Sequence, residues 1–306
     1  MNPTRPADPP IRVRSRGLYG ELRRDLAEVA YGREGGPAQC HTEVRVPAST
    51  SPFITHKGFH SQFLPDDRDL TVYLPPGYDP QGDRRYPVLY MHDGQNLFDP
   101  QSAFKKGEHW RVGETATSLI EAKRIEPVIV VGIANTGPRR LDEYTPTYDR
   151  RRRGGGEADS YGRLIVEELK PFVDATYRTH RDASHTAMAG SSLGGLVTLY
   201  LGLEHPDVFS RLGVMSPSVW WDRRVVLRTV REARPKPPLR IWVDMGVREG
   251  RRHVENAQLL RAGLLKAGWI EGQDLHYEEV AGGTHSEASW GARFGRVLEW
   301  LFARRL

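Results

Sequence analysis

The sequence predicts an α/β protein with a mostly parallel central sheet that is covered by helices on both faces. Two observations support this fold class. Short apolar segments alternate with longer segments of helical periodicity over most of the chain, and such alternation is typical of strand–helix–strand units joined by right-handed crossovers. Several of the short segments are also continuously apolar, which indicates strands buried on both faces.

An N-terminal extension is expected before these elements. Residues 1–17 are rich in proline and arginine without periodicity, which indicates a disordered arm. Residues 18–31 carry apolar side chains on one helical face, and the glycines and proline of residues 32–37 end that amphipathic helix. We therefore assign residues 1–57 to an extension and residues 58–306 to the main domain.

The first two strands of the main domain lack an intervening helix, so we expect an antiparallel edge there, and the later strands alternate with helices. The expected strands are 58–64, 69–75, 86–91, 127–133, 186–190, 211–216, 239–245 and 275–280. The expected helices are 111–123, 159–177, 193–204, 222–233, 253–267 and 288–303.

Composition excludes several classes of protein. The 306 residues include one cysteine, Cys40, so a disulfide framework and a multi-cysteine metal site are excluded. No segment is long and apolar enough for a membrane span, and the N-terminus lacks the apolar core and cleavage site of a signal peptide. We expect a soluble, cytoplasmic protein without a membrane partner.

The net charge of +5 results from 44 basic and 39 acidic residues. Because the arginines are scattered and often lie beside acidic residues, a solvated surface of mixed sign is favoured over a nucleic-acid partner. The segment RRRGGGE at residues 151–157 is expected to be a mobile surface loop. A short nucleic-acid-binding segment is the alternative for it.

A nucleophile is indicated directly after the predicted strand 186–190. Residues 190–194 match the pattern G-x-S-x-G with Ser192 at its centre. In this pattern the central serine lies on a sharp strand-to-helix turn that exposes its Oγ, and the glycines let strand and helix approach each other. We expect Ser192 to be the nucleophile and Ser191 to be structural, with a plain Gly/Ser turn as the alternative.

A nucleophilic serine needs a histidine base, which follows the serine along the chain in this architecture. His285 lies in the glycine-rich segment AGGTHSEASW after the last predicted strand, which would place it at the carboxyl ends of the strands beside Ser192. The other histidines fit less well, because His205 ends the serine's helix, His253 begins a helix and His276 lies within a strand.

The acid that orients the histidine is expected after the predicted strand 239–245. Glu249 in GVREG lies on the loop beyond this strand and is favoured. Asp244 lies nearer the strand interior, where it could instead anchor a loop by hydrogen bonds. Asp244 remains the alternative acid.

Two backbone N–H groups are needed to stabilise an oxyanion. Leu193 directly follows Ser192 and is expected to supply one of them. The loop HDGQN after strand 86–91 is expected to supply the other at Gln95, because the preceding glycine lets the backbone turn inward. His92 and Asp93 are expected to shape this loop, and since no further ligands follow at suitable spacing, neither a metal nor a cofactor is expected.

Seven segments, taken in order over about residues 58–304, together resemble the putative-esterase family of α/β hydrolases. They are YPVLYMHDGQNLFDP, GEHWRVGETATSLI, IVVGIANTGPRRLDEYTP, AGSSLGG, MSPSVWW, VDMGVREG and GGTHSEASWGARF. This group is similar to enterochelin esterases, feruloyl and acetyl-xylan esterases, esterase D and the mycolyltransferases. The resemblance implies an α/β hydrolase fold with Ser192, Glu249 and His285 as a triad. It also implies an oxyanion hole formed by the N–H groups of Leu193 and Gln95. The acid position of Glu249 matches the family's pattern G-T-x-[D/E], but Val247 stands where threonine is usual.

The resemblance further suggests which residues line the acyl or alcohol pocket. By position these are Trp110, Asn135, Arg140, Trp220 and Trp221. The alternatives are that the tryptophans pack in the core or at its rim and that Arg140 pairs with Asp142 or Glu143 on the surface.

The expected activity is hydrolysis of a small carboxylic ester through an acyl-enzyme, without a cofactor. The alternatives are an acyltransferase on the same scaffold and a non-catalytic binding protein. Aryl, acyl-carbohydrate, formylthioester and siderophore esters all remain compatible with the sequence.

Overall fold

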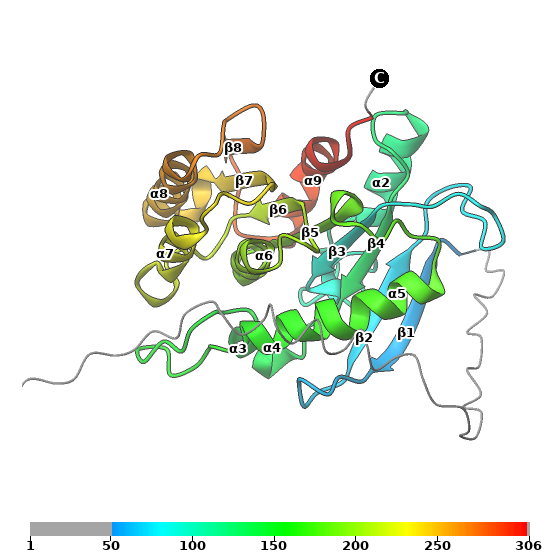
Figure 1. The fold of residues 1–306 in the computed structure, drawn as a ribbon, viewed down its shortest axis with the longest axis horizontal. Coiled ribbons are helices and arrows are strands. Elements are labelled where there is room, and N and C mark those ends of the chain that lie inside the picture. Colours follow the sequence, from blue (N-terminus) through cyan, green and yellow to red (C-terminus); the bar gives the residue numbers. More distant parts are fainter. Residues whose placement is uncertain (1–50, 305–306) are drawn as a thin grey trace, which may run out of the picture. The chain divides into compact units, whose positions relative to one another are not determined.

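The computed structural model describes residues 51–304, which build an α/β fold on an eight-stranded sheet (Figure 1). The strand order is β1-β2-β4-β3-β5-β6-β7-β8. The strands are β1 (Phe53–Phe59), β2 (Arg68–Tyr73), β3 (Val88–His92), β4 (Ile129–Ile133), β5 (Thr186–Ser191), β6 (Arg211–Met215), β7 (Arg240–Gly246) and β8 (Leu275–Val280).

The pairing confirms a mostly parallel sheet with an antiparallel N-terminal edge. Strand β2 pairs antiparallel with β1 and β4, and the remaining neighbours pair in parallel. The central strands β3, β4 and β5 are buried along their whole length, as their continuous apolar sequences predict.

Helices cover both faces of the sheet, and each face has its own apolar core (Figure 1). One face carries α2 (Val112–Glu121) and α9 (Glu287–Phe302). The other carries α4 (Ala158–Arg163), α5 (Lys170–Thr176), α6 (Leu193–Glu204), α7 (Val225–Glu232) and α8 (Arg251–Ala267). A short helix, α3 (Arg140–Glu143), precedes α4.

The predicted first strand is wrong in position. It spans Phe53–Phe59 rather than 58–64, so the sheet includes residues that the sequence analysis placed in the extension. As an edge strand, β1 is partly exposed on both faces, so its apolar pattern is weak. Its register with β2 shifts between His56 and Phe59, beside Gly58 with a φ of 63°.

Two predicted helices differ in detail. The helix expected at 159–177 contains a π-helical segment, Leu164–Leu169, just before Pro171. Proline has no amide hydrogen and breaks the regular α-helical bonding, which favours such an interruption. The helix expected at 222–233 begins only at Val225, because residues 222–224 have positive φ values.

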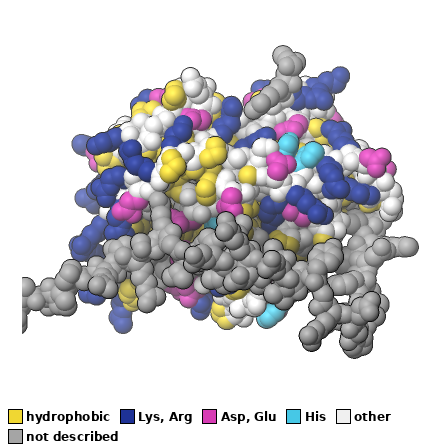
Figure 2. Space-filling model, viewed as in Figure 1, with side chains coloured by type: hydrophobic (Ala, Val, Ile, Leu, Met, Phe, Trp, Pro, Cys, Tyr) yellow, Lys and Arg dark blue, Asp and Glu magenta, His cyan; other side chains and the backbone are white. Residues whose placement is uncertain are grey.

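The predicted arm at 1–17 and the helix at 18–31 lie outside the described residues. Within residues 51–304, no helix combines the length and the apolar character needed to cross a bilayer. Figure 2 shows basic and acidic side chains interspersed over the visible face, as the mixed charge pattern predicts.

Candidate active site

Ser192 lies on the sharp turn between β5 and α6. Its backbone has φ 59° and ψ −121°, a strained combination for a residue with a Cβ. The flanking glycines permit the turn. A Cβ on Gly190 would lie 2.9 Å from the carbonyl carbon of Gly194, and a Cβ on Gly194 would lie 3.3 Å from the Cβ of His92. The turn presents the Ser192 hydroxyl at the carboxyl end of β5, as the G-x-S-x-G pattern predicts.

Two further loops bring His285 and Glu249 to Ser192. His285 lies between β8 and α9, and Glu249 ends a 3₁₀ turn, Val247–Glu249, after β7. His285 Nε2 is 3.0 Å from Ser192 Oγ, and His285 Nδ1 is 2.6 Å from Glu249 Oε2. Because an ionised carboxylate only accepts hydrogen bonds, Nδ1 carries the proton and Nε2 is left to accept the one on Ser192. The structure therefore brings these three residues into one hydrogen-bonded relay.

Asp244, the alternative acid, lies in a different environment. It is fully buried within β7, and its carboxylate accepts hydrogen bonds from Trp242 Nε1 at 2.8 Å and from Arg293 Nη2 at 2.9 Å. The backbone N–H of Ser216 donates to it at 3.2 Å. Asp244 thus anchors α9 and the loop after β6, and the geometry favours Glu249 as the partner of His285.

The Glu249 carboxylate oxygen that does not face His285 contacts a buried polar cluster. The sequence did not lead us to predict this cluster. Ser216 Oγ donates to Glu249 Oε1 at 2.5 Å. The same Oγ accepts from Trp290 Nε1 at 3.1 Å and from Arg293 Nη2 at 2.7 Å. The sequence does contain a signal for this cluster. Arg293 shares a helical face with the apolar residues of α9, and a buried arginine needs a buried polar partner.

These contacts keep Glu249 ionised. Burial opposes ionisation, but the hydrogen bonds from His285, Ser216 and the backbone of Gly246 outweigh it. The pKa of Glu249 is therefore lowered from its ordinary value. An ionised carboxylate at this position can stabilise a protonated His285 ring.

The two expected oxyanion donors lie on the elements that the prediction names. Leu193 is the first residue of α6, so its N–H has no partner within the helix. Gln95 lies in a 3₁₀ turn, Gly94–Asn96, after β3. A Cβ on Gly94 would lie 2.5 Å from the carbonyl carbon of Gly132, so glycine lets this turn press against β4. Their role as donors stays a prediction.

Asn135 and Arg140 both bind Asp93 rather than standing free in a pocket. Arg140 donates from Nε and Nη2 to the Asp93 carboxylate at 2.6 and 2.7 Å, and Asn135 Nδ2 donates to it at 2.7 Å. Arg140 therefore pairs with Asp93 and not with the acidic residues of its own helix. This cluster fixes the loop that carries Gln95, whose Oε1 accepts from the Asn135 N–H at 3.1 Å.

The predicted pocket tryptophans separate into two kinds. Trp110 is buried with its ring 5.9 Å from that of Trp290, and Trp221 is fully buried with Nε1 donating to Thr147 O. Both pack in the core, and Trp110 also lines a cavity of about 790 Å³ beside α2 and α9. A role of either tryptophan in binding substrate stays a prediction. Trp220 is partly exposed and packs against the guanidinium of Arg152.

His92 is a buried histidine beside the serine turn. Its Nδ1 lies 2.9 Å from the hydroxyl of Tyr161, and its Nε2 has no hydrogen-bond partner among residues 51–304. Burial lowers the pKa of His92 to about 3, although the nearby Asp93 opposes this. The neutral ring shapes the loop after β3.

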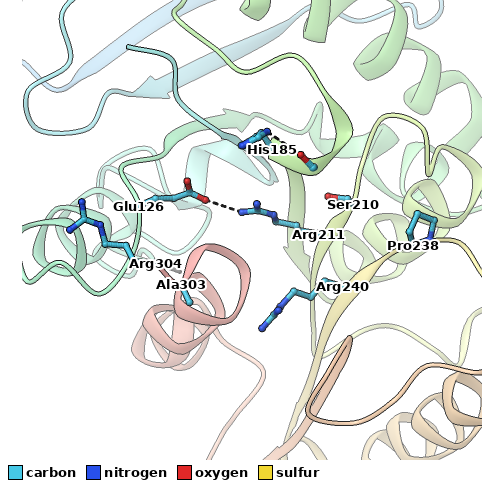
Figure 3. A pocket seen from close by; sticks show the side chains of 9 residues that line it. Glu126, His185, Ser210, Arg211, Pro238, Arg240, Ala303 and Arg304 are labelled. Carbon is cyan, nitrogen blue, oxygen red and sulfur yellow. Dashed lines mark hydrogen bonds and ion pairs between the residues drawn. The ribbon is translucent and has the colours of Figure 1, made fainter. Parts of the chain in front are cut away.

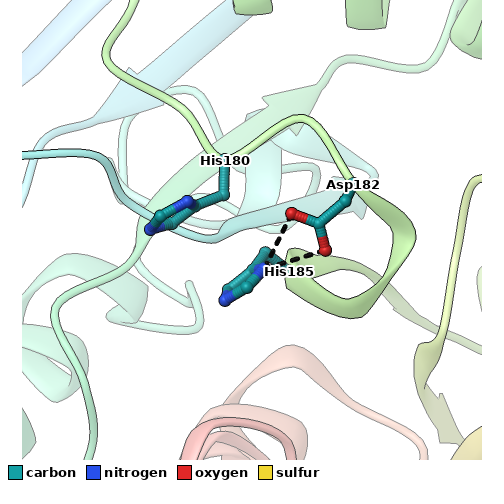
Figure 4. Close-up of side chains that lie close together, drawn as sticks. All are labelled: His180, Asp182 and His185. Atoms are coloured by element: carbon teal, nitrogen blue, oxygen red, sulfur yellow. Dashed lines mark hydrogen bonds and ion pairs between the residues drawn. The ribbon is translucent and has the colours of Figure 1, made fainter.

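One cluster in the described part of the chain could hold a metal ion, namely His180, Asp182 and His185 (Figure 4). The Asp182 carboxylate already accepts hydrogen bonds from Ser184 and His185. A cavity of about 660 Å³ lies next to it, and its lining includes Arg211 (Figure 3). Strands β5 and β6 begin here, so both features lie at the amino ends of the strands, across the sheet from Ser192. They do not belong to the serine site.

A turn serine, a histidine and a carboxylate at the strand ends of this fold define a site of the serine-hydrolase class. The family described as "Putative esterase" matches residues 61–301. The chain therefore belongs to the putative-esterase family.

Individual relatives agree with this membership. The uncharacterized protein YbbA of Bacillus subtilis is 28% identical and covers 81% of this chain and 98% of its own length. Ferri-bacillibactin esterase BesA of the same organism is 26% identical over 61% of this chain and 68% of its own length. The structure of the enterobactin esterase FES from Shigella flexneri with enterobactin is 23% identical, has a TM-score of 0.67, and covers 83% of this chain and 59% of that one. This last similarity shows a shared fold.

Proposed function

We propose that the protein is a serine carboxylic-ester hydrolase that works through an acyl-enzyme, with Ser192, His285 and Glu249 as its triad. The observation that carries the proposal is the relay of 3.0 and 2.6 Å hydrogen bonds from the Ser192 hydroxyl through His285 to Glu249. Membership of the putative-esterase family supports it.

The relay determines how the reaction proceeds. His285 Nε2 takes the hydroxyl proton while Ser192 Oγ attacks the ester carbonyl carbon, and the carbonyl oxygen becomes an oxyanion. The N–H groups of Leu193 and Gln95 stabilise this charge, each donor contributing roughly 3 kcal/mol. Loss of the alcohol, which takes the proton from His285, leaves the acyl group on Ser192. His285 then deprotonates water as its oxygen attacks the acyl carbonyl carbon. The bond from Ser192 Oγ to the acyl carbon breaks, the acid leaves, and His285 returns the proton to Ser192 Oγ.

The accessibility of His285 favours hydrolysis over acyl transfer. Its side chain is 43% exposed, so water has access to the base that would activate it. A transferase needs a site that excludes water in favour of an acceptor hydroxyl. The complete relay also argues against a non-catalytic binding protein.

The substrate class that we propose is a small aryl, acyl-carbohydrate or siderophore ester. The similarity to ferri-bacillibactin esterase BesA supports the siderophore ester, and the resemblance to feruloyl and acetyl-xylan esterases supports the other two. A panel of these esters, ranked by kcat/KM, would identify the preferred one.

Replacing the nucleophile tests the activity directly. We expect Ser192→Ala to abolish turnover of a short-chain para-nitrophenyl ester, because it removes the hydroxyl that lies 3.0 Å from His285 Nε2. Ser191→Ala is the matched control and should retain activity, since Ser191 is the last, buried residue of β5. Equal activity of wild type and Ser192→Ala, with unfolding curves that show both are folded, would refute the proposal.

A further inference from the structure

A basic, aromatic hollow lies at the turn after β6, and no residue of the triad lines it. Its volume is about 510 Å³. Two segments of the chain line it. One is residues 148–152, and the other contributes Trp220, Asp222 and Arg223. It includes part of the arginine run that the sequence analysis expected to be a mobile loop.

The structure anchors this arginine-rich loop to the turn after β6. Trp221 Nε1 donates to Thr147 O at 3.0 Å, and Thr147 Oγ1 donates to Asp222 Oδ2 at 2.7 Å. A Cβ on Gly155 would lie 2.5 Å from Trp221 Cζ2, so the glycines after the arginines let the loop pack closely on this indole. These contacts hold the loop that carries the arginines against the turn that carries Trp220.

The same turn touches the nucleophile. The Ser218 N–H donates to Ser192 O at 2.9 Å, and the Ser218 and Ser192 hydroxyl oxygens are 3.5 Å apart. Trp220 follows Ser218 by two residues, so their Cα atoms are at most about 7.6 Å apart. The hollow thus begins two residues along the chain from the residue that contacts Ser192.

The charge of the hollow favours an anion. Four arginines line it against two aspartates: Arg150, Arg151, Arg152 and Arg223 against Asp149 and Asp222. No ion pair to these arginines is formed by another residue of the described range 51–304. Both aspartates already accept hydrogen bonds, from the Arg151 N–H and from Thr147 Oγ1 respectively. The Arg152 guanidinium lies 4.8 Å from the centre of the Trp220 ring.

We propose that this hollow binds an anionic aromatic substituent of the ester substrate. The forked guanidinium groups match the geometry of a carboxylate or similar oxyanion, and the Trp220 indole offers a face for stacking an aromatic ring. The inference rests on the proposed ester hydrolysis and adds the charge and aromatic character of the substrate. The anion could be part of the acyl group or of the alcohol.

Two matched substrate pairs test the proposal and distinguish these sources. For the acyl side, para-nitrophenyl esters of para-carboxybenzoate and of neutral para-carbamoylbenzoate are compared. For the alcohol side, para-acetoxybenzoate is compared with neutral para-acetoxybenzamide. We expect the wild type to have a higher kcat/KM for the anionic member of one pair, and that pair identifies the side that occupies the hollow.

A pair of double variants then separates local binding from overall charge. Arg152→Gln/Arg223→Gln should lower the anionic-to-neutral ratio of kcat/KM by about tenfold, the effect of losing a charge-assisted hydrogen bond. Arg228→Gln/Arg231→Gln removes the same charge from exposed positions of α7 outside the hollow and should leave the ratio unchanged. The same loss in both variants, or no preference of the wild type in either pair, overturns the inference. In that case turnover that still depends on Ser192 leaves the proposed hydrolysis intact, whereas turnover that persists in Ser192→Ala refutes the hydrolysis itself.

Discussion

Glu249 and Asp244 lie near the end of β7 but contact different side chains. Glu249 faces His285 on one oxygen and Ser216 on the other. Asp244 is enclosed by β7, β6 and α9 and pairs with Arg293 at 2.9 Å. Residue type alone does not distinguish them, since both are acids close to the same strand end. The distinction comes from which side chain each one can reach.

Substituting each acid should separate catalysis from stability. Glu249→Gln removes the charge that stabilises the imidazolium, so we expect kcat to fall by roughly 10³- to 10⁴-fold with little loss of stability. Asp244→Asn leaves the buried Arg293 guanidinium with only the more distant carboxylate of Glu249, at 3.6 Å, as a counter-ion. We therefore expect a loss of about 3 kcal/mol in the free energy of unfolding. Steady-state kinetics and urea unfolding measure the two effects. The assignment is wrong if Asp244→Asn loses kcat at unchanged stability while Glu249→Gln remains active.

The turn between β5 and α6 depends on close backbone approach over several residues. Beyond Gly190 and Gly194, a Cβ on Gly195 would lie 2.7 Å from the carbonyl oxygen of Met215 in β6. The first turn of α6 is therefore packed directly on the neighbouring strand end. This contact holds Ser192 beside the loop that carries Ser216 and Ser218.

A glycine-to-alanine pair tests this packing. Gly195→Ala should destabilise the protein by roughly 1 to 3 kcal/mol through overpacking and lower kcat by displacing Ser192. Gly263→Ala is the matched control within α8, where the nearest atom would be 3.9 Å from the new Cβ. It should stabilise the protein by about 0.5 to 1 kcal/mol through helix propensity. Urea unfolding and the rate of ester hydrolysis provide the readouts, and equal effects of the two changes would contradict the packing argument.

The predicted elements are accurate where local apolar or turn signals are strong and inaccurate where these signals are weak. Helix α6 and strand β8 have the predicted bounds, because α6 is buried almost all round and β8 is bounded by turn residues. Strand β1 was misplaced because an edge strand with one neighbour has little apolar contrast. The π-helical segment before Pro171 depends on backbone bonding that a periodic pattern does not reveal.

We expect the free energy of unfolding to depend on pH because of the buried His92. The pKa of His92 is about 3 in the fold and 6.5 is its ordinary value. At pH values between about 3 and 6.5, His92 binds a proton in the unfolded chain but not in the folded chain. Stability is therefore lost as pH falls below about 6.5, by up to about 1.4 kcal/mol per pH unit.

The variant His92→Gln isolates this contribution. Glutamine keeps a hydrogen-bonding group near Tyr161 but does not titrate. We expect the unfolding free energy of the wild type to fall more steeply than that of His92→Gln between about pH 6.5 and pH 4.5, by on the order of 2 kcal/mol in total. Other histidines contribute equally to both proteins and cancel in the difference. Parallel slopes in urea-unfolding series across this range would show that His92 titrates in the fold as it does in the unfolded chain.

The sequence by itself determined the fold class, the position of Ser192 on a strand-to-helix turn and the loop that carries His285. These follow from local information, since apolar periodicity and glycine spacing act within a few residues. Only the tertiary structure decided the partner of His285, the burial of Trp110 and Trp221, and the pairing of Arg140 with Asp93. Each of these depends on residues far apart in the chain that meet only in the folded protein, and spacing along the chain does not encode such distances.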